Sequence, residues 1–283
     1  MGWDTVRTDG KNGTGNWNGC DIPLERIYAA ADKWRAAVGC EKKLWLCWNI
    51  SHRWSLLQQR MVAAAGWTPV VGFDPNCPPQ SLDVIPGAIF LDFNADLGLK
   101  VMWPHFPLEF SFLWADHLAF WHADLVMHMP QLMDIAHQFS QIPDGGIAAV
   151  HSTGGLRNMF QPKKHRYWEL LGCTTAGASR HQFEHGCGWW RHFEFHPNTP
   201  AAEQPERATY YYDSGVGIGY WEKRYQKKIL RLDGRKYLNG HCSEIGYPGH
   251  YKKSIHKGKE LDLNFDIEQV AKRFQLMPLL SQL

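Results

Sequence analysis

A histidine and an aspartate two positions apart, His122 and Asp124, are the pair whose types and spacing predict chemistry most directly in this 283-residue chain. They close an apolar run, residues 118–121, with the composition of a short buried strand. Side chains two residues apart at a strand end point to the same face, so the imidazole and the carboxylate converge. Such a pair can bind a divalent cation, and the cation can in turn bind a diphosphate.

The elements that must position this pair follow from the apolar pattern. Residues 43–51 have the pattern of a buried strand, residues 53–65 that of a helix ending at Gly66, and residues 68–74 that of a second strand. Strand, helix and strand in this order predict a βαβ unit of a parallel sheet, with a nucleotide site at the carboxyl ends of its strands. No GxGxxG sequence follows the first strand, so the dinucleotide-binding fingerprint is absent.

The rest of the chain extends this α/β pattern. We predict further strands at residues 85–94 and 146–150, and helices at residues 21–38, 130–139, 220–229 and 267–274. From residue 151 onward Gly, His and aromatic residues dominate, which indicates a more irregular region. The fold class predicted is α/β, a single domain with a mostly parallel central sheet and an irregular C-terminal half.

Two segments together resemble the GT-A type of glycosyltransferase, especially glycogenin and the bacterial retaining galactosyltransferases. One is the apolar strand that ends in His122-Ala-Asp124, with a proline-started helix after it, and the other is Asp213-Ser214-Gly215-Val216. In that family a strand ends in Asp-x-Asp, which binds Mn²⁺ or Mg²⁺ and the diphosphate of a nucleotide sugar. An Asn-(Ser/Ala)-Gly-Val segment lines the sugar pocket, and a late histidine completes the metal shell.

The resemblance carries over to this chain residue by residue. Asp124 matches the second aspartate of the motif and His122 replaces the first, which favours Mn²⁺ or another transition metal over Mg²⁺. Asp213 stands where the family has Asn. For the late histidine, His241 is the first choice and His250 the second, because the family pattern around that histidine is not present as such.

The resemblance also implies roles for the other candidates. Asp213 could orient sugar hydroxyls, shield a cationic sugar or act as a base, while Ser214, Gly215 and Val216 would line the sugar pocket. Asn49 and Ser51 follow the first strand, where they could contact the base or ribose of the nucleotide; a role in capping the next helix is equally open. The implied donor is a UDP-sugar and the implied acceptor an unidentified hydroxyl group.

On this interpretation residues 1–40 form an N-terminal lead-in and helix, and residues 41–283 a GT-A-like catalytic domain. Residues 41–150 would be its nucleotide-binding half and residues 151–283 its acceptor half.

Two other functions remain open. A non-catalytic carbohydrate- or nucleotide-binding protein of the same fold is favoured by histidine in place of the first aspartate. A His/Cys zinc-site enzyme is the second alternative, from the cluster of His181, His185, Cys187, His192 and His196. In the same region residues 186–191 could form an acceptor-side loop in which one of two tryptophans, 189 or 190, stacks on a sugar, although structural packing is an equal alternative.

Composition narrows the setting. The formal net charge of +2 and the scattered Lys and Arg residues give no reason to expect a nucleic acid partner. No apolar run approaches the ~20 residues of an integral membrane segment, and the start of the chain has no apolar signal region. Seven cysteines without a CxxC spacing favour reduced thiols, and we expect a cytoplasmic protein.

Overall fold

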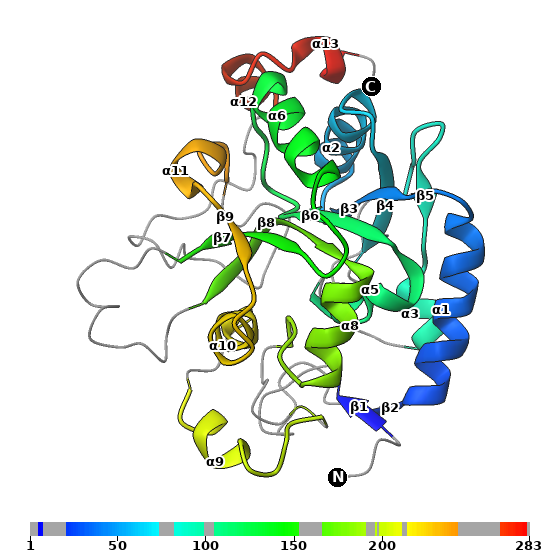
Figure 1. Ribbon diagram of the computed structural model, residues 1–283. Helices are drawn as coiled ribbons and strands as arrows, with labels where there is room; N and C mark the ends of the chain where they lie inside the picture. Colours follow the sequence, from blue (N-terminus) through cyan, green and yellow to red (C-terminus); the bar gives the residue numbers. More distant parts are fainter. Residues whose placement is uncertain are drawn as a thin grey trace, which may run out of the picture.

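The strand Lys43–Asn49 (β3) shows how the sequence builds the fold. Leu44 and Leu46 pack into one hydrophobic core, whereas Trp45 and Cys47 pack into a second core. Successive side chains of a strand point to opposite faces, so both faces of β3 are buried. A strand of this kind belongs in the interior of a sheet that helices cover on both sides, and Figure 1 shows that arrangement.

The computed structural model describes residues 5–7, 21–73, 82–98, 105–152, 166–190, 196, 198–210, 214–242 and 267–281. Its main sheet has seven strands in the order β5-β4-β3-β6-β8-β7-β9. Besides β3 these are β4 (Thr68–Phe73), β5 (Ile89–Phe90), β6 (His117–Trp121), β7 (Ile147–His151), β8 (Tyr167–Thr175) and β9 (Ile229–Leu232). A separate pair, β1 (Thr5–Arg7) and β2 (Asp21–Pro23), is antiparallel.

The sheet is mixed and mostly parallel. The pairs β4/β5, β3/β4, β3/β6 and β7/β9 are parallel, whereas β8 runs antiparallel to both of its neighbours, β6 and β7. From β3 the chain moves outward through β4 to β5, and it then returns to form β6 on the other side of β3. The strand order therefore reverses between β3 and β6, and ligands of α/β sheets bind at the carboxyl ends of such a pair.

Helices complete a three-layer domain. On one face lie α2 (His52–Ala64), α6 (Met129–Ser140), α11 (Gly234–Tyr237), α12 (Ile267–Arg273) and α13 (Met277–Leu280). On the other lie α1 (Leu24–Val38), α3 (Phe93–Leu97), α4 (His105–Glu109), α5 (Ser111–Trp114), α8 (Ala176–Glu184) and α10 (Val216–Arg224), with the short α9 (Gln204–Arg207) beyond α10 (Figure 1). The predicted α/β single domain with a mostly parallel sheet is thereby confirmed.

Several predicted elements occur close to their expected bounds, and others do not. The predictions at residues 43–51, 53–65, 68–74, 130–139 and 146–150 correspond to β3, α2, β4, α6 and β7. The strand expected at residues 85–94 is limited to β5, because Asp92 accepts a hydrogen bond from the Ala95 amide (3.0 Å) and thereby caps α3. The helix expected at residues 220–229 starts earlier and ends at Arg224, and Ile229 opens β9.

The longest strand, β8, was not predicted from the sequence. Tyr167–Thr175 shows no clear strand pattern in the sequence, because one charged residue and one glycine are mixed with apolar and hydroxyl side chains. Gly172 is required here, since a Cβ atom at this position would collide with the Phe120 ring and the Ala148 carbonyl of the two adjacent strands. Among the described helices, no apolar segment has the length needed to cross a lipid bilayer.

Candidate metal centre

The carboxyl end of β6 holds two of the predicted metal ligands. After Trp121 the backbone turns, with the Leu125 amide donating to the His122 carbonyl at 3.1 Å. The His122 amide donates to the Leu170 carbonyl of β8 at 3.0 Å, so the first ligand is anchored to the neighbouring strand. His122 and Asp124 consequently stand side by side at the point where the strand order reverses.

The third ligand comes from a segment 119 residues away in the sequence. After α11 the chain passes alongside the β6 turn, where His241 forms an isolated antiparallel bridge with Leu125. The Val126 amide donates to the Gly240 carbonyl (3.2 Å), and the Cys242 amide donates to the Asp124 carbonyl (2.9 Å). These bonds on both sides of His241 fix its backbone against the turn that follows β6.

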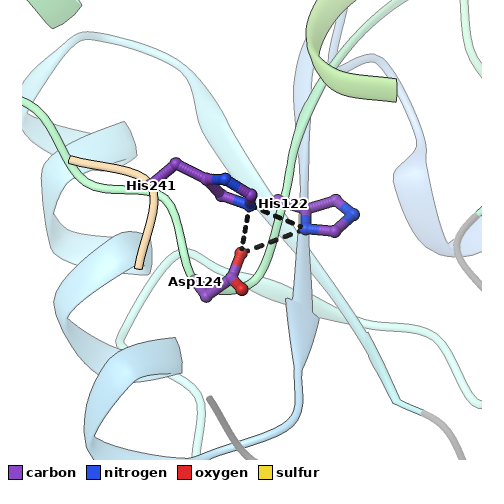
Figure 2. A group of neighbouring side chains, drawn as sticks. All are labelled: His122, Asp124 and His241. Atoms are coloured by element: carbon purple, nitrogen blue, oxygen red, sulfur yellow. Dashed lines mark hydrogen bonds and ion pairs between the residues drawn. The ribbon is translucent and has the colours of Figure 1, made fainter. Parts of the chain in front are cut away.

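Figure 2 shows the three side chains converging, one atom from each. His122 Nδ1 lies 3.0 Å from Asp124 Oδ1, His241 Nε2 lies 3.1 Å from the same oxygen, and the two nitrogens are 3.3 Å apart. Two ligand atoms that each lie ~2.1 Å from a metal ion, at angles between ~90° and ~110°, are ~3.0 to ~3.4 Å apart. All three separations match this expectation, so the group could hold a metal ion.

Hydrogen bonds alone account for this triangle less well. If each imidazole donates its proton to Asp124, the 3.3 Å contact joins two N–H donors, and donors repel one another. A central cation is instead attracted by both nitrogen lone pairs and the carboxylate. Two imidazoles and one carboxylate form a donor set for Mn²⁺, Fe²⁺, Co²⁺ or Zn²⁺, whereas Mg²⁺ prefers oxygen ligands alone.

The electrostatics of the group favour positive charge at its centre. Burial by itself raises the pKa of the Asp124 carboxyl, but hydrogen bonds and charge from His122 and His241 outweigh it and lower the pKa well below its usual range. Burial lowers the pKa of His122, and the bond to Asp124, together with the charges of Asp124 and Glu169, raises it above its ordinary value. The carboxylate is therefore ionised and attracts a cation, either a proton on the imidazole or a metal ion.

The three side chains differ in their exposure to solvent. The exposed fraction of the side chain falls from 36% for His122 to 19% for His241 and 5% for Asp124. A bound ion would therefore keep access to an external ligand past His122, while Asp124 holds it from the protein side.

A buried glutamine supports the turn from beneath. Gln58 lies in α2 and is fully buried, and its Nε2 donates to the carbonyls of both His122 and Leu125 at 2.8 Å. Groups that hold metal ligands in place commonly contribute ~10- to 100-fold to the affinity for the metal. Nothing in the local sequence of α2 marks Gln58, because its role depends on the position of a strand more than 60 residues later.

A second residue missed at the sequence level is Glu169 in β8. Its Oε1 accepts a hydrogen bond from the Ser214 hydroxyl at 2.9 Å, and its charge acts on His122. A single carboxylate in the apolar run Tyr-Trp-Glu-Leu-Leu is the signal that could have identified it.

The remaining predicted site residues fall at different places. Asn49 is fully buried at the carboxyl end of β3, beside β6. Ser51 occupies the N-cap position of α2, although its hydroxyl makes no capping hydrogen bond. Ser214 joins the site through Glu169, and Asp213 and His250 lie outside the described residues.

The two residues after Ser214 have clear structural roles. Gly215 has a φ of +76°, and its carbonyl accepts from the Tyr167 amide at 3.1 Å, so backbone meets backbone where no Cβ atom would fit. Val216 begins α10, and its side chain is fully buried in the core. The segment thus packs the start of α10 against β8.

The His/Cys-rich region does not supply a second centre among the described residues, whose only three-ligand group is the one around Asp124. His196 is buried with Glu109 (Nε2 to Oε1, 3.1 Å), and Cys187 contacts Arg207. The tryptophans of the adjacent loop are packing residues: Trp189 and Trp190 are 1% and 3% exposed, and Trp189 lies edge-on to Phe120.

Compared with protein-family models, with curated proteins and with solved structures, the chain gives no match.

Proposed function

We propose that this protein is a metal-dependent glycosyltransferase that moves a hexose from a UDP-sugar to a hydroxyl acceptor. The observation that carries the proposal is the convergence of His122, Asp124 and His241 on one point. The resemblance to GT-A enzymes names these residues as metal ligands from the sequence alone, although 119 residues separate the two histidines. If His122-Ala-Asp124 resembled the motif only by chance, there would be no reason for His241, the histidine that the resemblance selects, to lie beside it.

The position of the group supports the same function. It lies at the carboxyl ends of β3 and β6, where the strand order reverses and where α/β sheets bind nucleotides. On the β3 side Asn49 ends the adjacent strand as a buried residue, and the partly exposed Ser51 would be the residue there that contacts a base or ribose. On the other side β8 is bonded to the His122 amide through the Leu170 carbonyl, and the neighbouring Glu169 accepts a hydrogen bond from Ser214.

The chemistry of hexose transfer fits these residues. Cleavage of the anomeric C–O bond leaves a diphosphate, and a divalent metal held by the three ligands would supply the positive charge that stabilises it. Asp124, ionised and nearly buried, would anchor the ion, and the two neutral imidazoles would leave it a net positive charge. The partial exposure of His122 leaves an open side for the diphosphate.

Calorimetric titration of UDP, with and without Mn²⁺, tests the proposal. We expect UDP binding that requires Mn²⁺ and that weakens by more than ~100-fold in Asp124→Ala, because even residues behind metal ligands contribute ~10- to 100-fold. Asp116→Asn is the control. Asp116 precedes β6 at its opposite end and pairs with Arg35, so its replacement should leave UDP binding unchanged both with and without Mn²⁺.

Two outcomes would contradict the proposal in different ways. If a UDP-sugar binds while Mn²⁺ does not, the protein is a carbohydrate- or nucleotide-binding protein without metal-dependent turnover. If UDP binds under no condition, the glycosyltransferase assignment is wrong at its centre.

A further inference from the structure

The strand β8 departs from regular pairing beside the metal centre. Along β7, Ala149 pairs with Gly172 and the next residue, Val150, pairs with Trp168. Three residues of β8, 169–171, therefore have no counterpart on β7 and form a bulge. Bulges of this kind commonly redirect a side chain next to a functional site.

The bulge directs two groups toward the site. The Leu170 carbonyl accepts from the His122 amide at 3.0 Å, which ties the bulge to the first metal ligand. The carboxylate of Glu169, the residue before Leu170, accepts from the Ser214 hydroxyl at 2.9 Å. Glu169 therefore connects the metal centre to the Ser214-Gly215 segment, which the resemblance assigns to the sugar pocket.

We infer that Glu169 contacts the transferred hexose and accepts hydrogen bonds from its hydroxyl groups, with Ser214 holding the carboxylate in position. This inference rests on the proposed function and adds the residue that recognises the sugar part of the donor. Nothing in the resemblance assigns a role to this position of the chain.

The partners of Glu169 set it apart from other half-buried carboxylates. Glu222 pairs with Arg231 at 2.9 Å, and Glu203 pairs with Arg207 at 2.7 Å, so each is neutralised within the fold. Over the ranges that the structure describes, no ion pair joins Glu169, and its hydrogen-bond donor is a neutral hydroxyl. A carboxylate with this environment retains charge and acceptor capacity for the hydroxyl groups of a ligand.

The state of the carboxyl group is consistent with this role. Its Oε1 accepts from the Ser214 hydroxyl at 2.9 Å, and an ionised carboxylate has two oxygens that can accept hydrogen bonds from a ligand.

The test measures the sugar-dependent part of donor affinity. Mn²⁺ alone, UDP with Mn²⁺, and UDP-glucose, UDP-galactose and UDP-N-acetylglucosamine with Mn²⁺ are titrated into the wild type and Glu169→Ala. We expect the variant to bind Mn²⁺ and UDP within about threefold of wild type and to bind the preferred UDP-sugar about 10- to 100-fold more weakly, the range for a lost charged hydrogen bond. Ser214→Ala should shift the same affinity in the same direction by less.

Glu222→Ala is the matched control, since it also removes a carboxylate beside Tyr167 but one that pairs with Arg231. This variant should bind Mn²⁺, UDP and the UDP-sugars with the affinities of the wild type. If Glu169→Ala binds every UDP-sugar as wild type does, the inference is wrong and the proposed function stands. If the variant loses Mn²⁺ binding as well, Glu169 serves the metal and not the sugar. If the wild type binds no UDP with Mn²⁺, the inference and the proposed function both fail.

Discussion

Two backbone carbonyls beside the candidate metal centre accept hydrogen bonds from one glutamine. Gln58 Nε2 donates to the carbonyls of His122 and Leu125, both at 2.8 Å, from a fully buried position in α2. Removing this donor takes a hydrogen bond from each carbonyl: the His122 carbonyl keeps the bond from the Leu125 amide (3.1 Å), whereas an unpaired buried carbonyl at Leu125 would cost about 1–3 kcal/mol. The turn could then relax, and the imidazole of His122 would shift away from Asp124.

We therefore predict that Gln58→Met lowers the affinity for Mn²⁺ by about 10-fold or more and also lowers the free energy of unfolding. Methionine preserves most of the side-chain volume, so the effect isolates the lost hydrogen bonds. Mn²⁺ titration and denaturant unfolding measure the two quantities.

Gln138→Met provides the comparison. Gln138 lies in α6 and donates to the Tyr237 hydroxyl at 3.2 Å, in a partly buried position away from the turn. The Gln138→Met variant should have a lower free energy of unfolding and the Mn²⁺ affinity of the wild type. Equal Mn²⁺ affinities of the Gln58 variant and the wild type would contradict the supporting role.

Single residues differ in how far the sequence reveals them. His122 and Asp124 could be predicted because the pattern of a strand places both on one face. His241 required the resemblance, since 119 residues separate it from His122. Glu169 and Gln58 could not be predicted, because each acquires its role from a contact between elements that the sequence alone does not bring together.

The segment that carries His241 reaches the centre through a close backbone approach. A Cβ atom at Gly240 would collide with the Val126 carbonyl and would also lie 2.9 Å from the Phe274 ring. The Val126 amide donates to the Gly240 carbonyl, so these two backbone stretches pack directly against each other. Only glycine allows this approach, which in turn sets the position of the neighbouring imidazole.

Gly240→Ala should accordingly push the segment away from the β6 turn and lower Mn²⁺ affinity by about 10-fold or more, with a smaller effect on stability. The metal affinity of the variant should resemble that of His241→Ala. Gly145→Ala tests whether any glycine replacement has this effect, because Gly145 also lies in a turn, with a φ of +84° and open space around its Cβ position. Unchanged Mn²⁺ affinity in Gly240→Ala would show that the segment tolerates the methyl group.

Elements could be predicted where one rule dominates their sequence. A short continuous apolar run marks β3 as a strand that is buried on both faces, and apolar residues at helical spacing mark α2 and α6. The bulged β8 obeys neither rule, since residues 169–171 interrupt its pairing with β7. The start of α10 was also hidden, because Gly215 precedes it with a left-handed backbone that no local pattern predicts.

On the scale of the whole molecule, the candidate metal centre joins the first half of the sheet to a late segment of the chain. His122 and Asp124 follow β6, whereas His241 follows α11. A ligand that binds only when both parts are in place stabilises the folded state, by ~2.7 kcal/mol when its free concentration is 100 times its Kd.

We predict that saturating Mn²⁺ raises the midpoint of thermal unfolding and that EDTA reverses the shift. Mg²⁺ at the same concentration should produce a much smaller change, because the centre offers two imidazoles and only one carboxylate. Asp124→Ala should show no shift with either ion. An Mn²⁺-induced shift of the same size in that variant would place the stabilising ion somewhere else on the protein.

The placement of β8 also affects how the chain acquires its structure during synthesis. The ribosome delivers β6 and β7 before the strand that lies between them, since β8 follows both in the sequence. Until Tyr167–Thr175 has emerged, each of the two earlier strands presents an unpaired edge that can pair with other chains. The arrival of this nine-residue strand closes the two facing edges together, and the outer edge of β7 stays unpaired until β9 (Ile229–Leu232) has also emerged.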